Sequence, residues 1–117
     1  MIFFDHTISE RNENLIQFTA YENQTNEGEC LLDLRYDDAE VTFISYNQNK
    51  PYIAEGLIRA AFNYAANKGF YMGKCCCEYA VSVLENMNFE NRNGLYINDI
   101  PSILMGKCCC KNKQSID

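Results

Sequence analysis

Alternating apolar and polar positions mark several strands along this chain. Residues 15–21 and 31–36 alternate in this way, which predicts strands that bury one face. Residues 41–46 are apolar on both faces, and this pattern is typical of a strand in the middle of a sheet. Further strands are predicted at 2–4, 70–76 and 95–97.

The segments between these strands carry turn and helix signals. Residues 22–29 are polar and include Asn-Glu-Gly, which predicts a hairpin loop. Thr7 is followed three positions later by Glu10, a capping-box spacing that predicts one helical turn at 7–10. Residues 37–38 are both aspartates and predict a turn.

The clearest helix covers residues 52–68. Glu55 and Arg59 on its polar face are spaced for a favourable i,i+4 ion pair. Pro51 suits the first helical turn, and Gly69 suits the left-handed position beyond the last turn. The apolar face consists of Ile53, Leu57, Ile58, Ala61, Phe62 and Ala65. A second helix is predicted at 78–87 and a short one at 99–106.

This order of elements predicts an α/β fold. Hairpin-linked strands come first, and strand–helix–strand units follow them, so we expect a mixed, mostly antiparallel, twisted sheet with two main helices. About five to six strands would form the sheet. We expect a single domain over residues 1–110 and a polar C-terminal tail over 111–117.

Composition and charge narrow the classes of function. The net charge of −6 argues against nucleic acid as the main partner, because binding phosphates requires a surplus of Lys and Arg. The apolar runs are all far shorter than the roughly 20 residues that cross a bilayer. The first residues have no basic region of the kind that opens a signal peptide, so we expect no membrane partner and a cytoplasmic location.

Seven cysteines are a high number for 117 residues. Six of them form two triplets, at 75–77 and 108–110, each preceded by Gly-Lys. An odd number without an export signal favours reduced thiols over disulfides. Consecutive cysteines on a strand point to opposite faces, whereas zinc ligands are usually two to four residues apart, so we expect no metal site.

Two segments of the sequence resemble the GNAT family of N-acetyltransferases, over about half the chain. Residues 41–46, a polar loop and residues 53–61 are similar to the acetyl-CoA motif of that family, which has a strand ending in a bulge, a glycine-containing loop and a helix. Residues 80–89, ending in Asn88-Phe89, are similar to the family segment that ends in Gly-Phe. The resemblance implies a GNAT-like fold that is short on its N-terminal side.

The resemblance also implies a function, the transfer of an acetyl group from acetyl-CoA to a small amine or a peptide amine. The backbone of residues 44–46 would hold the thioester carbonyl, and residues 48–54 would hold the pyrophosphate. The residues implied in binding the cofactor are Ile44, Ser45, Tyr46, Gln48, Asn49, Lys50, Pro51, Tyr52, Ile53 and Ala54.

The sequence departs from the family pattern at the phosphate loop and at the usual acid. Tyr52 stands where the family has its pyrophosphate glycine, and Pro51 removes one N–H donor. Lys50 could compensate as a point charge. Leu84 stands where many members have a tyrosine that protonates the leaving thiolate, and Cys77 stands where an asparagine is common.

Three residues are candidates for catalysis. Cys76 or Cys77, followed by Glu78-Tyr79, is similar to the cysteine of a small branch of the superfamily and could accept the acyl group before the amine does. The alternative is that both are small packing residues of a strand. Tyr46, at the end of the central strand, is a candidate acid by position, and packing is its alternative role.

Two other functions compete with acetyl transfer. A GNAT-like domain could bind CoA or a partner without catalysis, which the changes at Pro51, Tyr52 and Leu84 favour. A thiol-rich metal-binding or redox protein would instead use the cysteine triplets. A homodimer is compatible with the short N-terminal region, because a second copy could cover sheet surface that this region leaves open.

Overall fold

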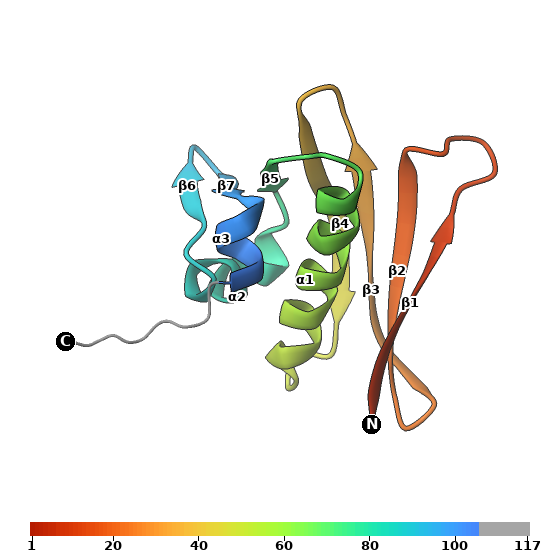
Figure 1. Ribbon diagram of the computed structural model, residues 1–117. Helices are drawn as coiled ribbons and strands as arrows, with labels where there is room; N and C mark the ends of the chain where they lie inside the picture. Colours follow the sequence, from red (N-terminus) through yellow and green to blue (C-terminus); the bar gives the residue numbers. More distant parts are fainter. Residues whose placement is uncertain (106–117) are drawn as a thin grey trace.

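The computed structural model describes residues 1–105, which form a seven-stranded sheet in the order β1-β2-β3-β4-β5-β7-β6. All neighbouring strands are antiparallel except β4 and β5, which are parallel. The predicted mixed, mostly antiparallel sheet is therefore confirmed (Figure 1). The strands are β1 (Ile2–Ile8), β2 (Leu15–Glu22), β3 (Thr25–Leu34), β4 (Asp38–Tyr46), β5 (Met72–Cys75), β6 (Glu90–Arg92) and β7 (Leu95–Asp99).

One long helix and three short helical segments follow the first four strands. Pro51 is the first residue of the long helix α1, and Gly69 adopts φ +93° after its end, as the sequence predicts. The predicted ion pair of Glu55 and Arg59 is formed at 2.9 Å. The segments are α1 (Pro51–Asn67), the 3₁₀ helix η1 (Glu78–Ala80), α2 (Val81–Asn86) and α3 (Ile100–Met105).

The helical turn predicted at 7–10 is wrong, because the first strand continues through Thr7 and Ile8. These two residues pair with Gln17 and Ile16 of β2. The capping-box spacing is a local signal, and pairing with a neighbouring strand overrides it.

The loop predicted at 22–29 is also wrong, because β2 and β3 are joined by a tight turn. Asn23 and Gln24 adopt positive φ angles of 52° and 71°, so two residues suffice to reverse the chain. The glycine of the predicted loop, Gly28, lies instead within β3, where it pairs with Tyr46.

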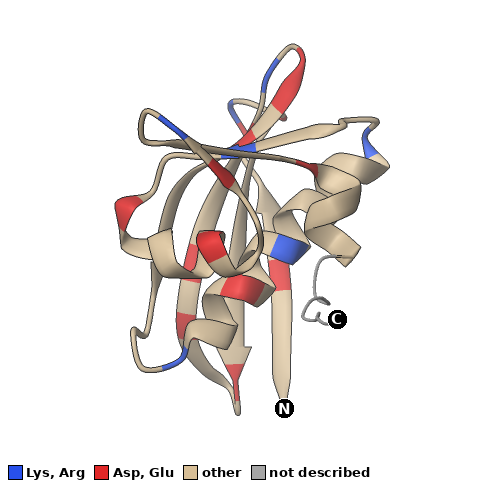
Figure 2. Cartoon of the chain, turned by 90° about the vertical axis from the view of Figure 1, so that its left-hand side faces the viewer, with Lys and Arg blue, Asp and Glu red and all other residues tan. Residues whose placement is uncertain are grey.

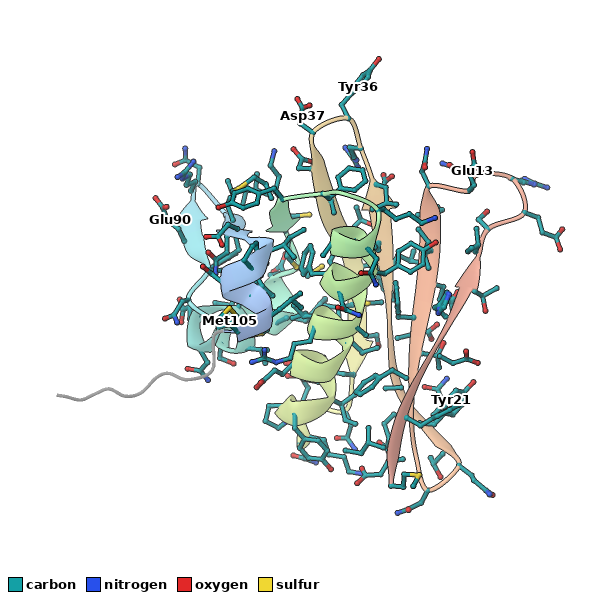
Figure 3. All side chains as sticks on the ribbon, in the orientation of Figure 1. Glu13, Tyr21, Tyr36, Asp37, Glu90 and Met105 are labelled. Carbon is teal, nitrogen blue, oxygen red and sulfur yellow. The ribbon has the colours of Figure 1, made fainter. Side chains whose placement is uncertain are left out.

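The strand predicted at 31–36 ends at Leu34, and the next three residues, 35–37, form the tip of the β3–β4 hairpin. Tyr36 and Asp37 lie at this tip and point away from the sheet (Figure 3). Strand β4 therefore begins at Asp38, three residues earlier than predicted.

The C-terminal part differs from prediction in three places. The strand predicted at 70–76 covers only Met72–Cys75. The helix predicted at 78–87 is divided into η1 and α2. Strand β6 was not predicted, and it pairs with β7 across a turn in which Asn93 and Gly94 have positive φ angles of 58° and 90°. The predicted tail at 111–117 and the second cysteine triplet lie outside the described residues.

The core lies between the sheet and α1. The six residues predicted to form the apolar face of α1 are all fully buried. Phe62 from α1 and Ile103 from α3 both pack over Gly73 of β5, where a side chain would leave them no room. Arg59 joins the two helices, since its guanidinium donates hydrogen bonds to the carbonyls of Ile103 and Leu104 at 3.0 and 2.9 Å.

Candidate functional site

The two parallel strands at the centre of the sheet stay together for only four residue pairs. Asp38 to Val41 of β4 pair with Met72 to Cys75 of β5, and β4 then continues to Tyr46 without this partner. The register between β3 and β4 also shifts, which makes Thr42 an extra residue on β4. A bulge of this kind bends its strand and changes the direction of the groups that follow. It lies at Thr42, four residues before the strand end where the sequence placed it.

A pocket of about 400 Å³ lies where β4 continues alone. The three predicted catalytic residues all line it, together with Ile44, Ser45 and Gln48 of the predicted cofactor site. Its full lining is Thr42, Phe43, Ile44, Ser45, Tyr46, Gln48, Cys76, Cys77, Glu78 and Tyr79. The remaining predicted cofactor residues do not line it; they are Asn49, Lys50, Pro51, Tyr52, Ile53 and Ala54. Thr42 and Phe43 line the pocket although the sequence did not single them out for it, and Glu78 and Tyr79, which follow the cysteine triplet, also line it.

The sulfur of Cys77 lies between the two diverging strands. Its thiol approaches the carbonyl oxygen of Val41, with 3.7 Å between sulfur and oxygen. The backbone N–H of Ile44, which follows the bulge, faces the same sulfur and lowers its pKa. Cys77 is only 9% exposed. It therefore contacts β4 at and just beyond the last pair of the two strands, Val41 with Cys75.

Three buried thiols gather around this position and differ in acidity. Burial raises the pKa of Cys30 to about 12. A hydrogen bond with Cys77, together with burial, raises the pKa of Cys75. The same hydrogen bond lowers the pKa of Cys77; the Ile44 N–H acts in that direction too, and burial opposes both. Among the three, Cys77 is therefore the thiol that ionises most readily.

Cys76 points to the other face of the sheet and has a different partner. It is exposed, and its thiol donates a hydrogen bond to the Glu40 carboxylate at 3.3 Å. Partial burial and this carboxylate raise the pKa of Cys76, because a thiolate would be repelled by the negative charge. The predicted alternation of the triplet between the two faces is confirmed, and the two candidate nucleophiles are chemically unequal.

A tyrosine crosses the pocket from β4 to η1. The hydroxyl of Tyr46 donates a hydrogen bond to the main-chain carbonyl of Tyr79 at 3.0 Å. The contact ties the end of β4 to the turn after β5, across the region where the two strands have separated. It also places a phenolic proton at the pocket.

The start of α1 has few free N–H donors, because the preceding loop uses them. The N–H of Asn49 is bonded to the Asn47 side chain at 3.0 Å, and the N–H of Lys50 to the Asn47 carbonyl at 2.8 Å. The N–H of Ile53 is bonded to the Lys50 carbonyl at 2.9 Å. Pro51 has no N–H. A helix start binds anions through such groups, and here most of them already have partners.

The charge of Lys50 is also engaged. Its ammonium contacts Glu22 at 3.2 Å and Glu27 at 3.0 Å, and the Tyr52 hydroxyl donates a hydrogen bond to Glu22 at 2.9 Å. The Tyr52 hydroxyl and Lys50 lower the pKa of Glu22, and Lys50 and Asn47 lower that of Glu27. The point charge predicted for phosphate is thus balanced by two carboxylates.

Other chemistry suggested by the sequence can be compared with the described residues. Within residues 1–105, no three side chains of the metal-binding types come close enough to hold an ion. Leu84, at the position of the usual family acid, is fully buried. His6, the single histidine, packs against the rings of Phe18 and Tyr64. No helix in the described part has both the length and the apolar character needed to cross a membrane.

Comparisons with known proteins identify the fold. No family model matches the sequence, and no curated protein is significantly similar to it. A probable acetyltransferase from Staphylococcus epidermidis ATCC 12228 is similar in structure, with a TM-score of 0.68 and 16% identity over 78% of this chain and 71% of that chain. The PaiA N-acetyltransferase from Thermoplasma acidophilum, in complex with coenzyme A, has a TM-score of 0.60 and 15% identity over 72% of this chain and 58% of that chain.

A third similar structure carries the family name. It is an acetyltransferase of the GNAT family from Staphylococcus aureus Mu50, with a TM-score of 0.63 and 12% identity over 74% of this chain and 68% of that chain. The chain therefore has the fold of the GNAT acetyltransferases, as the sequence resemblance implied. At these identities the likeness extends to the fold alone.

Proposed function

We propose that this chain is an N-acetyltransferase that moves the acetyl group of acetyl-CoA to an amine, in the pocket between β4 and β5. The observation that carries the proposal is the backbone N–H of Ile44, which follows the Thr42 bulge and points between two diverging strands. This fixed N–H would stabilise the negative charge that develops on a thioester carbonyl during attack, with the carbonyl oxygen taking the place of the Cys77 sulfur as its partner. The thioester supplies an activated acetyl carbon.

Two pocket residues could serve the departure of the thiolate and the binding of the amine. The Tyr46 hydroxyl is the candidate acid, because it lies at the pocket and could protonate the departing thiolate. The Glu78 carboxylate also lines the pocket, where it would attract a cationic amine. Aminoglycoside acetyltransferases are among the similar structures, which supports an amine as the acceptor class.

The test is turnover of acetyl-CoA with a panel of amines, followed as release of the CoA thiol. Tyr46→Phe should lower kcat by about 10²–10⁴-fold, the usual range for a lost general acid. Tyr71→Phe is the matched control, since Tyr71 is exposed and precedes the opposite end of β5. Unchanged kcat in Tyr46→Phe would remove the acid role from Tyr46, and no turnover with any amine would contradict the proposed activity.

A covalent route through Cys77 is the second form of this mechanism. The Cys77 sulfur has the lowered pKa and lies at the Ile44 N–H, whereas Cys76 lies against Glu40. In this route the thiolate attacks the acetyl carbon, the carbon–sulfur bond to CoA breaks, and the amine then takes the acetyl group from Cys77. An acetyl adduct after mixing with acetyl-CoA, retained in Cys76→Ala and lost in Cys77→Ala, is the expected result. An adduct that survives Cys77→Ala would exclude this route.

A binding domain without catalysis is the alternative function. The buried Leu84 in place of the usual acid and the engaged Lys50 favour it. Calorimetry and the thiol-release assay together separate the two functions. Both a binding domain and an enzyme would bind acetyl-CoA, but a binding domain would release no CoA thiol with any amine of the panel.

A further inference from the structure

A coenzyme A thioester has two chemically different ends. The pantetheine arm is neutral and extended, and it carries amides and the thioester. The nucleotide end is a polyanion of pyrophosphate and ribose phosphate. In this chain the two ends would meet different surroundings, one at the pocket and one at the start of α1.

The pocket suits the neutral arm. Strand β4 continues to Tyr46 beyond its last pair with β5. Apart from the groups of Val41 and Ile44 that Cys77 engages, its backbone there can bind an extended chain with amide groups as an added strand. Phe43, Tyr46 and Tyr79 provide apolar and aromatic surface around it. The single charged side chain among the described residues that line the pocket is the carboxylate of Glu78.

The start of α1 does not suit the polyanion. Lys50 is the basic residue there, and it is held between Glu22 and Glu27, so the cluster carries one positive and two negative charges. A phosphate placed beside it would be repelled by the excess carboxylate. The N–H groups of Asn49 and Lys50 are bonded within the loop, and Pro51 contributes none. Figure 2 shows the Lys and Arg positions of the described residues on several separate segments of the chain.

We propose that this site recognises its acyl donor by the pantetheine thioester arm alone, with no net contribution from the nucleotide phosphates. The inference rests on the proposed acetyl transfer. It assigns the donor to the class of pantetheine thioesters, which exist free, within acyl-CoA, and on the phosphopantetheine group of acyl carrier proteins. Acetyl-CoA is then one member of the donor class.

The first experiment compares kcat/KM for acetyl-CoA, S-acetylpantetheine and an acetylated acyl carrier protein, with the same amine. We expect the two small donors to agree within about threefold. Two charge-assisted phosphate contacts would instead favour acetyl-CoA by more than about 100-fold, at roughly 1.5–3 kcal/mol for each contact. A faster reaction with the carrier protein supports the proposal and indicates a protein-bound source, whereas equal rates support it with a free thioester as the source.

The second experiment releases Lys50. In the double variant Glu22→Gln/Glu27→Gln the ammonium loses both carboxylates and can reach a phosphate. We expect KM for acetyl-CoA to fall by about fivefold or more, and KM for S-acetylpantetheine to stay unchanged. Glu29→Gln is the control, because this carboxylate lies on the same strand as Glu27 and accepts a hydrogen bond from Gln17 instead.

The outcomes separate this inference from the function on which it rests. If acetyl-CoA is preferred over S-acetylpantetheine by more than about 100-fold, the inference is overturned and the acetyltransferase function stands. If the double variant improves both donors equally, the carboxylates do not act on phosphate, and the inference is again overturned. If no donor is turned over and none binds in calorimetry, the proposed function itself fails.

Discussion

Gly28 of β3 pairs with Tyr46 at the end of β4, and adding one methyl group to it tests how closely the site is packed. A Cβ at this position would lie 2.8 Å from the Ser45 carbonyl oxygen, 3.0 Å from the Tyr46 Cβ and 3.2 Å from a methyl group of Ile53. The first two atoms belong to β4 in the pocket wall, and the third belongs to α1. In Gly28→Ala, β4 must move by about 0.6 Å to reach ordinary contact distance.

The size of the effect follows from two opposing terms. Overpacking of a close-packed site costs about 1–3 kcal/mol. Replacing glycine restricts the unfolded chain and offsets about 0.4–1 kcal/mol of that cost. We therefore expect Gly28→Ala to lower the free energy of unfolding by about 1–2 kcal/mol, or Tm by about 4–8 °C per kcal/mol. Because the displaced residues line the pocket, kcat/KM should fall further than stability alone explains.

Thermal unfolding and turnover of acetyl-CoA measure the two effects separately. Gly73→Ala is the matched control, since its Cβ would meet the side chains of Phe62 and Ile103 at 2.8 and 2.9 Å, away from the pocket. We expect the control to lose stability and to keep its kcat/KM at temperatures where it is folded. Wild-type stability in Gly28→Ala, or an equal loss of kcat/KM in both variants, would refute this account of the pocket wall.

Two further predictions concern the charged contacts of α1. Lys50→Met should lower Tm most at neutral pH, because Lys50 lowers the pKa values of the Glu22 and Glu27 carboxylates. The difference in Tm from wild type should shrink as the pH falls below about 4.5, where these carboxylates become protonated. A difference that stays constant with pH would contradict the pairing. Lys68→Met is its control, because the Lys68 ammonium lies over the Tyr64 ring, 5.6 Å from its centre. Arg59→Met should lower the free energy of unfolding by about 1–3 kcal/mol, because it leaves two carbonyls of α3 without their donor; unchanged denaturant unfolding would contradict this.

The elements with a long periodic pattern were predictable from the sequence. Helix α1 has Pro51 at its start, a buried apolar stripe and Gly69 after its end, and every one of these signals agrees with the others. The strand at 41–46 was recognised from its apolar pattern, although only Val41 and Ile44 of this segment are buried and Phe43 is exposed. Strand β4 provides one wall of the pocket from Thr42 to Tyr46, so recognising this strand from the sequence also located that wall.

The errors occur where pairing between strands decides the structure. Thr7 looks like a helix cap, and nothing local shows that β2 will pair with it. The short strand β6 has no buried side chain to give it a pattern. The partners of Lys50 were equally hidden, because Glu22 and Glu27 lie more than 20 positions away and reach it only through the β2–β3 hairpin.

The four-residue pairing of β4 with β5 has a consequence for the order in which the molecule opens. The sheet is divided at this seam into an antiparallel meander of β1 to β4 and a smaller unit of β5 to β7, and α1 packs against both parts (Figure 1). Few backbone hydrogen bonds hold the seam, so we expect its amides to exchange with solvent before those of β2 and β3. Native-state hydrogen exchange would then resolve two cooperative units, with the pocket at the boundary between them.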